Sequence, residues 1–297
     1  MSASILVELF YLGIVLFTSL GLSLLLTPLS IKLAMRYGFM DIPDKRKVHK
    51  EPVPRLGGLA IGMSLILTLI LNVSLSRLIV SYIVGLLFIL LFGMLDDKKG
   101  ISPRLKYLLQ LVPPAIFVFG SGTYLTSFGD LLGMGEIRLG ALGPFLTLFC
   151  MAGVMNAINL SDGLDGLAAG KCLICAAYLF IFAYVSGHYL FAILLTAVFG
   201  ALLGFLAFNT HPARLFMGDS GSLSLGFTMG VTTVGIVQAS YGHPIKPISM
   251  AMVLALPIFD TLVVMGRRLL TGKSILSPDK THFHHLLLRA GFSHPTS

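Results

Sequence analysis

The sequence has no tryptophan, few charged residues and only three cysteines. Charged residues make up 11% of the 297 residues. A soluble domain carries about 25%, so the chain has too few charges for a surface that faces only water. Without Trp, any aromatic belt at a membrane interface must come from Tyr and Phe. Cys150, Cys172 and Cys175 lie inside apolar runs, so the CxxC spacing of the last two needs no redox or metal role.

The chain consists largely of long runs of apolar residues. Hydrophobic residues make up 56% of it, and the mean hydropathy is +0.90. Apolar runs of about 18–23 residues recur along the chain, each long enough to cross a hydrocarbon layer of roughly 30 Å. Lipid cannot satisfy an open backbone, so we expect each run to be helical. The sequence therefore predicts an all-α, polytopic integral membrane protein with about nine transmembrane helices, at 5–27, 56–74, 78–95, 106–122, 142–159, 168–186, 189–208, 222–240 and 247–266.

Basic residues predict the orientation of these spans. Of the 21 Lys and Arg residues, all but Arg77, Arg138 and Lys246 fall on one side if the loop after the first span is cytoplasmic. This asymmetry predicts an N-terminus outside and a cytoplasmic C-terminus. It also accounts for much of the +8 net charge, so we expect no nucleic-acid partner. The first run has no basic leader or cleavage site, so we interpret it as a span, and residues 1–297 as a single integral membrane domain.

Acidic residues are also scarce, and their positions are informative. Five of the thirteen lie in three short loops on the predicted inside: Asp96, Asp97, Asp162, Asp165 and Asp219. Carboxylates near a membrane boundary are costly and therefore indicate function. The adjacent pair at 96 and 97 could instead simply end a helix in solvent.

Two of these loops combine acidic residues with glycine. In NAINLSDGLDGLAAG, the glycines let a ligand approach the backbone, and Asn159 with Asp162 offers oxygen ligands. Helix capping alone is the alternative there. In FMGDSGSLSLG, Asp219 opens the eighth span with exposed backbone N–H groups, which suits either a phosphate or an ordinary N-cap.

Together, the loops indicate a site for a magnesium diphosphate. Mg²⁺ takes one or two protein oxygens and completes its shell with water and phosphate. The histidines in PDKTHFHHLLLRAG could instead bind zinc, or belong to a solvated basic tail, but no Cys accompanies them. The bases available for the remaining phosphate charge are Lys106, Arg214, Arg268, His282, His284 and His285.

Five segments, taken in order, resemble the polyprenyl-phosphate N-acetylhexosamine-1-phosphate transferases over residues 41–291. They are RKVHKEPVPRLGG, the Asp96–Asp97 pair, NAINLSDGLDGLAAG, PARLFMGDSGSLSLG and HFHH. The resemblance implies transfer of a sugar-1-phosphate from a UDP-sugar donor to a polyprenyl phosphate acceptor, with release of UMP. It places the enzyme in a bacterial inner membrane, with cytoplasmic active-site loops at 32–55, 96–106, 159–170, 209–221 and 267–291.

The resemblance also implies roles for individual residues. Asn159 and Asp219 would bind Mg²⁺, with Mn²⁺ as an alternative. Asn209, Phe216, Gly163 and Leu164 would line a uridine pocket. The other implied substrate-binding residues are Lys47, His49, Arg55 and Arg268. The implied catalytic residues are Asp96 (the family's candidate base), Asp97, Lys106, Asp162, Asp165, His282, His284 and His285.

Two details favour the branch of the family that uses UDP-N-acetylglucosamine and undecaprenyl phosphate. Pro54–Arg55 precedes Gly57–Gly58, and the histidines follow the order H-x-H-H. The branch that transfers phospho-muramyl-pentapeptide, the alternative, is typified by Thr-Met before the glycines and three consecutive histidines. The implied role is the first membrane step of a cell-envelope glycan, such as O-antigen, enterobacterial common antigen or teichoic acid, and a homodimer is plausible.

Three other classes share part of this pattern. A nucleotide-sugar transporter would also be polytopic, but its binding residues should lie near mid-membrane, where only Asp260 is found. A CDP-alcohol phosphotransferase shares part of DGLDGLAAG but needs further Asp residues downstream. A membrane scaffold would leave the five motif loops unexplained.

Overall fold

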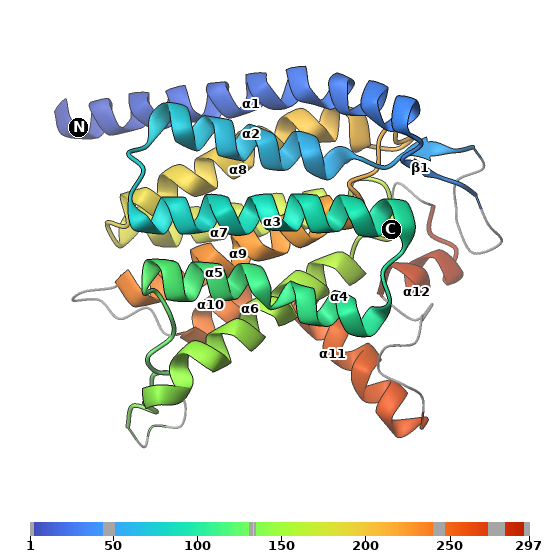
Figure 1. The fold of residues 1–297 in the computed structure, drawn as a ribbon. Helices are drawn as coiled ribbons and strands as arrows, with labels where there is room; N and C mark the ends of the chain where they lie inside the picture. Colours follow the sequence, from blue (N-terminus) through green and yellow to red (C-terminus); the bar gives the residue numbers. More distant parts are fainter. Residues whose placement is uncertain are drawn as a thin grey trace.

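The computed structural model describes residues 3–43, 51–130, 133, 135–239, 247–272 and 283–293. Over these residues the chain is almost entirely helical, and the helices stack side by side with a short hairpin at one end (Figure 1). The elements are α1 (Ala3–Tyr37), β1 (Met40–Asp41), β2 (Val53–Pro54), α2 (Gly57–Asn72), α3 (Arg77–Lys99), α4 (Pro103–Gln110), α5 (Val112–Ser121), the 3₁₀ turn η1 (Gly140–Leu142), α6 (Gly143–Leu160), α7 (Leu167–Val185), α8 (Tyr189–Asn209), α9 (Gly218–Ala239), α10 (Pro247–Val253), α11 (Ala255–Leu270) and α12 (Phe283–Arg289).

Six helices in the described part of the chain are long and apolar enough to cross a membrane. They are α1, α3, α6, α7, α8 and α9, and α10 with α11 makes a seventh if that bent pair counts as one span. The polytopic, mainly helical class is therefore confirmed. The predicted count of nine is not, because α2 has only 16 residues and the predicted span 106–122 is divided between α4 and α5.

Proline explains the interruptions. Pro113 and Pro114 lack the N–H groups that α4 would need to continue, so a new helix starts around them. Pro257 lacks the N–H that would bind the carbonyl of Val253, and α10 and α11 meet at 84°. Cys175 of α7 donates its thiol to that Val253 carbonyl (3.3 Å), which ties the bend to the bundle.

The core surrounds α9. An apolar stretch of 18 residues in this helix is 89% buried inside the bundle. Small residues let its neighbours approach closely. A Cβ on Gly226 of α9 would lie 2.4 Å from the Cα of Met155 in α6, and a Cβ on Gly58 of α2 would lie 2.2 Å from the backbone nitrogen of Gly221. Close backbone packing of this kind is typical of membrane helices.

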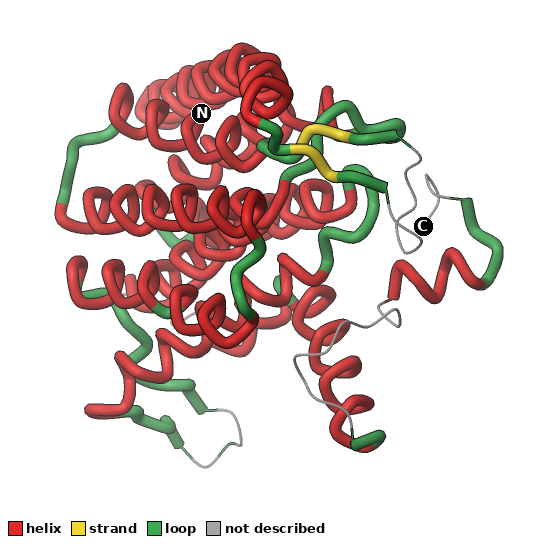
Figure 2. Tube along the Cα trace, turned by 45° about the vertical axis from the view of Figure 1, so that its right-hand side comes forward, coloured by secondary structure: helices red, strands yellow, loops and turns green. Residues whose placement is uncertain are grey.

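The hairpin lies at one end of the bundle, on the same side as α12 (Figure 2). Met40 pairs with Pro54 and Asp41 with Val53. The segment that follows β2 is joined to the chain before α9, because Phe216 donates its N–H to Pro54 and accepts from Gly57 (2.8 and 2.9 Å). The start of α2 and the start of α9 are thus held together at this end.

Candidate active site

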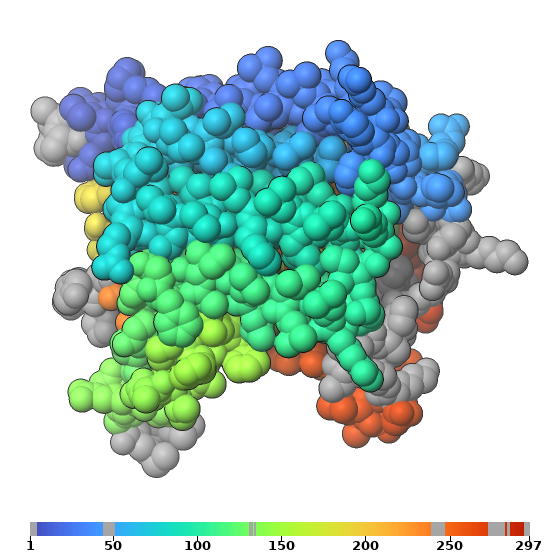
Figure 3. All heavy atoms as spheres, viewed as in Figure 1, coloured from blue at the N-terminus to red at the C-terminus, as the bar shows by residue number. Residues whose placement is uncertain are grey.

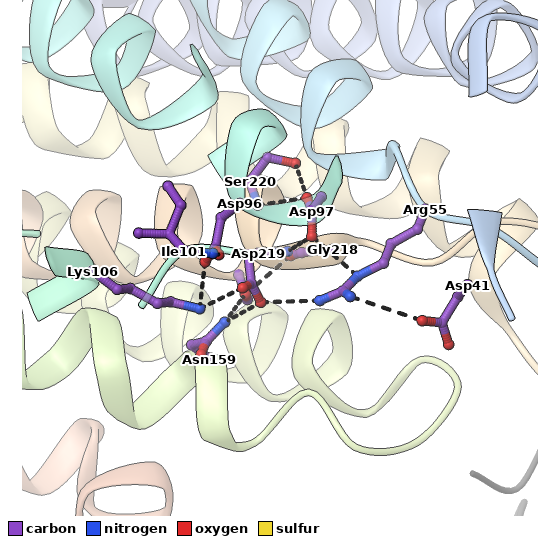
Figure 4. Close-up of polar contacts among 11 residues, drawn as sticks. Asp41, Arg55, Asp96, Asp97, Ile101, Lys106, Asn159, Gly218, Asp219 and Ser220 are labelled. Atoms are coloured by element: carbon purple, nitrogen blue, oxygen red, sulfur yellow. Dashed lines mark hydrogen bonds and ion pairs between the residues drawn. The ribbon is translucent and has the colours of Figure 1, made fainter. Parts of the chain in front are cut away.

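Polar side chains from four helices meet at the end of the bundle that carries the hairpin (Figure 4). Asp96 and Asp97 come from the last turn of α3, and Lys106 from α4. Asn159 and Asp219 lie at the end of α6 and the start of α9. The sequence predicted that these segments share one face, and the structure brings them into contact.

Asp219 is the centre of this cluster. Its Oδ1 accepts from Nη2 of Arg55 (3.1 Å) and from Nδ2 of Asn159 (2.9 Å), while its Oδ2 contacts Nζ of Lys106. Asn159 also donates to the hydroxyl of Ser222 one turn along α9 (2.8 Å). One carboxylate is therefore surrounded by two cations and an amide.

Asp97 fixes the start of α9. Its carboxylate is 0% exposed; Oδ1 accepts from the backbone N–H of Asp219 (2.8 Å), and Oδ2 from the N–H and hydroxyl of Ser220 (3.2 and 3.1 Å). These contacts satisfy N–H groups that a helix leaves open at its first turn. Gly218 has φ of 73°, and a Cβ there would lie 2.6 Å from Oδ2 of Asp97, so this approach requires glycine.

Lys106 joins two carboxylates. Its Nζ lies 2.8 Å from Oδ2 of Asp96 and also contacts Asp219, while Oδ1 of Asp96 accepts from the backbone N–H of Ile101 (2.7 Å). Burial by itself would lower the pKa of Lys106, but the attraction of Asp219 and Asp96 raises this pKa above its usual value. Lys106 is therefore a fixed positive charge.

Arg55 has a carboxylate at each of its three nitrogens. Nε lies 3.0 Å from Asp97, Nη2 3.1 Å from Asp219, and Nη1 3.8 Å from Asp41 of the hairpin. Burial opposes the charge, yet these carboxylates raise the pKa of Arg55 above its ordinary value. The sequence indicated Arg55 as a substrate-binding residue; the structure shows it holding the acidic residues together.

Asp162 is half-buried beside this cluster, in the loop after α6. Burial raises the pKa of its carboxyl to about 7; Arg55 offsets part of this rise, and repulsion from Asp219 and Asp97 adds to it.

The predicted uridine residues lie in two loops joined by Asn209. Its Oδ1 accepts from the N–H of Gly166 (3.1 Å) and its Nδ2 donates to the carbonyl of Leu215 (2.8 Å). Leu164 is buried and Gly163 is exposed, both in the first loop, and Phe216 lies in the second.

Asp165 joins the same two loops. It accepts from Nδ1 of His211 (2.8 Å) and from the N–H of Ala213 (3.1 Å). His211 was missed by the sequence analysis, because a lone His beside a proline carries no motif signal.

Some predicted residues cannot be placed in the cluster. Lys47, His49 and His282 lie outside the described residues, as do the side chains of His284 and His285. Arg268 is buried in the last turn of α11, outside the network of Figure 4.

The donor set fits a hard divalent cation. Asp219 offers carboxylate oxygens, and turning over the Asn159 amide would present its oxygen beside them. No group of three or more His, Cys, Asp or Glu in the described part of the chain could hold a metal. A cation here would thus depend on phosphate and water for most of its shell, as Mg²⁺ does with diphosphates.

An apolar groove of about 660 Å³ is lined by Tyr107, the neighbour of Lys106 in the chain. Tyr107 lies at one end of it, and α6, α9 and the bent pair α10–α11 supply its walls through residues such as Phe149, Val234, Leu254 and Ile258. Figure 3 shows this edge of the molecule hollowed between α6 and α11. Such a groove can take a hydrocarbon chain whose polar end lies at the cluster.

Comparison with known proteins gives a consistent result. Residues 79–237 match the model of glycosyl transferase family 4. The chain is 36% identical over 277 residues to the "Probable undecaprenyl-phosphate N-acetylglucosaminyl 1-phosphate transferase" of Bacillus subtilis (strain 168), covering 92% of this chain and 76% of that protein. It is 33% identical over 268 residues to the undecaprenyl-phosphate alpha-N-acetylglucosaminyl 1-phosphate transferase of Escherichia coli (strain K12), covering 88% and 72%. It is 35% identical over 290 residues to the decaprenyl-phosphate N-acetylglucosaminephosphotransferase of Mycolicibacterium smegmatis, covering 88% and 71%.

Proposed function

This chain belongs to glycosyl transferase family 4, and from that we propose that it transfers N-acetylglucosamine-1-phosphate from UDP-N-acetylglucosamine to undecaprenyl phosphate, releasing UMP. The names of the relatives support both the sugar and the lipid. The five sequence motifs indicate the same family.

One structural observation carries the proposal. A cluster of carboxylates, with Lys106 and Arg55 fixed among them, lies near an apolar groove that is lined by Tyr107, the residue after Lys106, and by Asn156, one turn before Asn159 on α6. A diphosphate needs charge neutralisation and a polyprenyl chain needs apolar walls, so the two substrates would meet where these features adjoin.

The reaction is a single in-line displacement. An oxygen of the lipid phosphate attacks the phosphorus that bears the sugar; a new P–O bond forms, and the bond between that phosphorus and the oxygen of UMP breaks. Phosphoryl transfer depends mainly on positioning and electrostatic stabilisation. Lys106 supplies a fixed charge for the phosphates, and Arg55 keeps Asp219 and Asp97 in register.

The main role of Asp96 is to position the acceptor or the metal ion rather than to act as a general base. A phosphate monoester has a second pKa of about 6 and is mostly dianionic at neutral pH, so a base would add little. Both oxygens of Asp96 are engaged, by Lys106 and by the N–H of Ile101. A covalent aspartyl intermediate is the alternative; a phosphorylated Asp trapped without lipid would support it, and its absence under rapid quench would exclude it.

Asp219 and Asn159 would hold Mg²⁺, or Mn²⁺ in its place, which when bound would withdraw charge from the diphosphate. We place the cluster on the cytoplasmic side of a bacterial inner membrane, because the basic residues concentrate there. Asp260, the exception among acidic residues that otherwise lie at the inside ends of the predicted spans, accepts from the N–H of Phe283 at the start of α12 (2.8 Å), which gives it a structural role.

The test is UMP release by purified protein in detergent, with undecaprenyl phosphate, Mg²⁺ and each of several UDP-sugars. We expect release with UDP-N-acetylglucosamine alone, abolished by EDTA. Release with UDP-muramyl-pentapeptide would keep the family and overturn the sugar. No release with any donor, together with uptake of labelled UDP-sugar into vesicles, would favour a transporter.

A further inference from the structure

A second groove lies on the opposite face of the bent pair α10–α11. The first groove is lined by Ala251, Leu254 and Ile258 of this pair. The second uses Met252, Val253 and Leu256 on their other side, and faces α7. Its volume is about 420 Å³, and its apolar walls include Ile174, Tyr178 and Phe182 of α7.

This groove has a polar end. Lys171 is the one basic residue among those that line it, and it lies in the first turns of α7, at the same end of the bundle as Asp162 and Asp165. Lys171 also lines a small adjoining cavity, together with Ser161. The Ser161 hydroxyl is 1% exposed and has no hydrogen-bond partner among the described residues. A basic residue and a hydroxyl without a partner among the described residues therefore line adjoining cavities near the start of α7.

The walls are fixed by the fold. The thiol of Cys175, which lines the groove, donates to the Val253 carbonyl that Pro257 leaves open. The bend that shapes the groove is thus anchored to α7. Asp260 of α11 also attracts Lys171, but its carboxylate is engaged by the N–H of Phe283.

We propose that this groove binds an anionic phospholipid of the surrounding bilayer, with its phosphate at Lys171 and an acyl chain along α7. The charge of Lys171 is complementary to a lipid phosphate, and basic pockets between membrane helices recognise such headgroups. Tyr107 and Asn156, which line the first groove near the Asp219 cluster, do not line this one. A lipid held there is therefore a structural ligand, distinct from the reacting acceptor.

The experiment is native mass spectrometry of the detergent-purified chain with phosphatidylglycerol, with phosphatidylcholine of the same acyl chains, or with undecaprenyl phosphate. One lysine near a membrane phosphate contributes roughly 1 kcal/mol, about a fivefold preference. We expect the wild type to retain phosphatidylglycerol about fivefold more, and Lys171→Gln to lose the preference. Lys99→Gln, at an exposed position at the end of α3, is the matched control and should keep it.

A second variant tests the groove without touching the charge. Ile174→Trp should fill it and reduce retention of both lipids while Lys171 remains. Unchanged phosphatidylglycerol retention in both Lys171→Gln and Ile174→Trp would overturn the site. Equal retention of phosphatidylglycerol and phosphatidylcholine by the wild type would overturn headgroup recognition. If undecaprenyl phosphate is retained in preference to both, and Lys171→Gln loses this preference, the groove belongs to the acceptor instead. Because these readouts measure binding, they are independent of whether the chain turns over a UDP-sugar.

Discussion

At the scale of single residues, Asp219 has the strongest claim to a role in the reaction. Its carboxylate contacts Arg55, Lys106 and Asn159, which come from three separate segments of the chain. These contacts are compatible with a site in which phosphates and a metal ion replace some of them during turnover.

Replacing Asp219 by Asn should reduce turnover by about 10³-fold, the scale of losing one group that stabilises a transition state. The change keeps the shape but removes the charge that Arg55 and Lys106 contact, so thermal unfolding in detergent is measured alongside to separate a loss of stability from a loss of turnover. UMP release gives the readout, and Asp130→Asn, in the loop between α5 and α6, is the control. Normal turnover in Asp219→Asn would refute the metal assignment.

Arg55→Lys tests whether the guanidinium acts as an organiser. A lysine keeps the charge but cannot contact Asp97 and Asp219 through separate nitrogens in fixed geometry. A hydrogen bond to a charged group contributes about 1.5–3 kcal/mol, so we expect kcat/KM to fall by at least about tenfold. Arg104→Lys, exposed on α4, should be neutral. Equal activity of both variants would mean that only the charge of Arg55 matters.

Asp162 should give a pH-dependent stability. Its pKa is raised to about 7 in the folded protein, chiefly by burial, so between pH 4 and 7 the folded state holds a proton that the unfolded state releases. This contribution to stability is lost as the pH rises through 7. In EDTA, wild type and Asp162→Asn should unfold at similar temperatures at about pH 4, and the variant should become the more stable of the two as the pH rises to 8. A gap that does not change with pH would contradict the raised pKa.

The sequence predicted Asp219, Asn159 and Lys106 as one site because each lies in a recognisable motif. It could not predict that Asp97 caps α9 while Asp96 pairs with Lys106, because adjacent residues are equivalent in a motif until a helix turns them apart. Nor could the sequence predict which carboxylates contact Arg55. Asp219 is far from Arg55 in sequence and is brought close to it by the backbone pairing at Phe216.

At the scale of elements, the site depends on how closely α2 and α3 approach α9. A Cβ on Gly93 of α3 would lie 2.4 Å from the Cα of Ser220, and one on Gly58 of α2 would lie 2.2 Å from the nitrogen of Gly221. Both contacts fall on the first turn of α9, beside Asp219. Glycines in apolar runs thus position the catalytic end.

Gly58→Ala should therefore destabilise the protein by about 1–3 kcal/mol, as overpacking does, and should reduce turnover as well. Gly153→Ala on α6 is the matched control, because a Cβ there meets nothing within 4 Å. Thermal unfolding in one detergent compares the two. Equal unfolding temperatures would show that the α2–α9 contact is not tight.

The apolar runs predicted the long helices well, from α3 and α6 to α9. They failed at 106–122 and 247–266, where hydropathy is continuous but Pro113, Pro114 and Pro257 interrupt the hydrogen bonding. Hydropathy measures transfer to lipid and is blind to a missing N–H. Hydropathy therefore could not predict the bend between α10 and α11, and this bend separates the two grooves.

At the scale of the whole molecule, a polar cluster occupies one end of a helical bundle, and apolar grooves run from that end along both faces of α10–α11. This arrangement suits a reaction between a water-soluble donor and a lipid held in the bilayer. It also explains the low charge of the chain, since the polar residues concentrate at one end.

The transfer of label from donor to lipid tests the central claim most directly. UDP-N-acetylglucosamine carrying ³²P at the phosphorus next to the sugar is incubated with the protein, undecaprenyl phosphate and Mg²⁺, and the lipid is extracted. We predict label in the lipid together with the sugar, and unlabelled UMP in water. Sugar in the lipid with the label left in UDP would mean transfer of the sugar alone and would contradict the account.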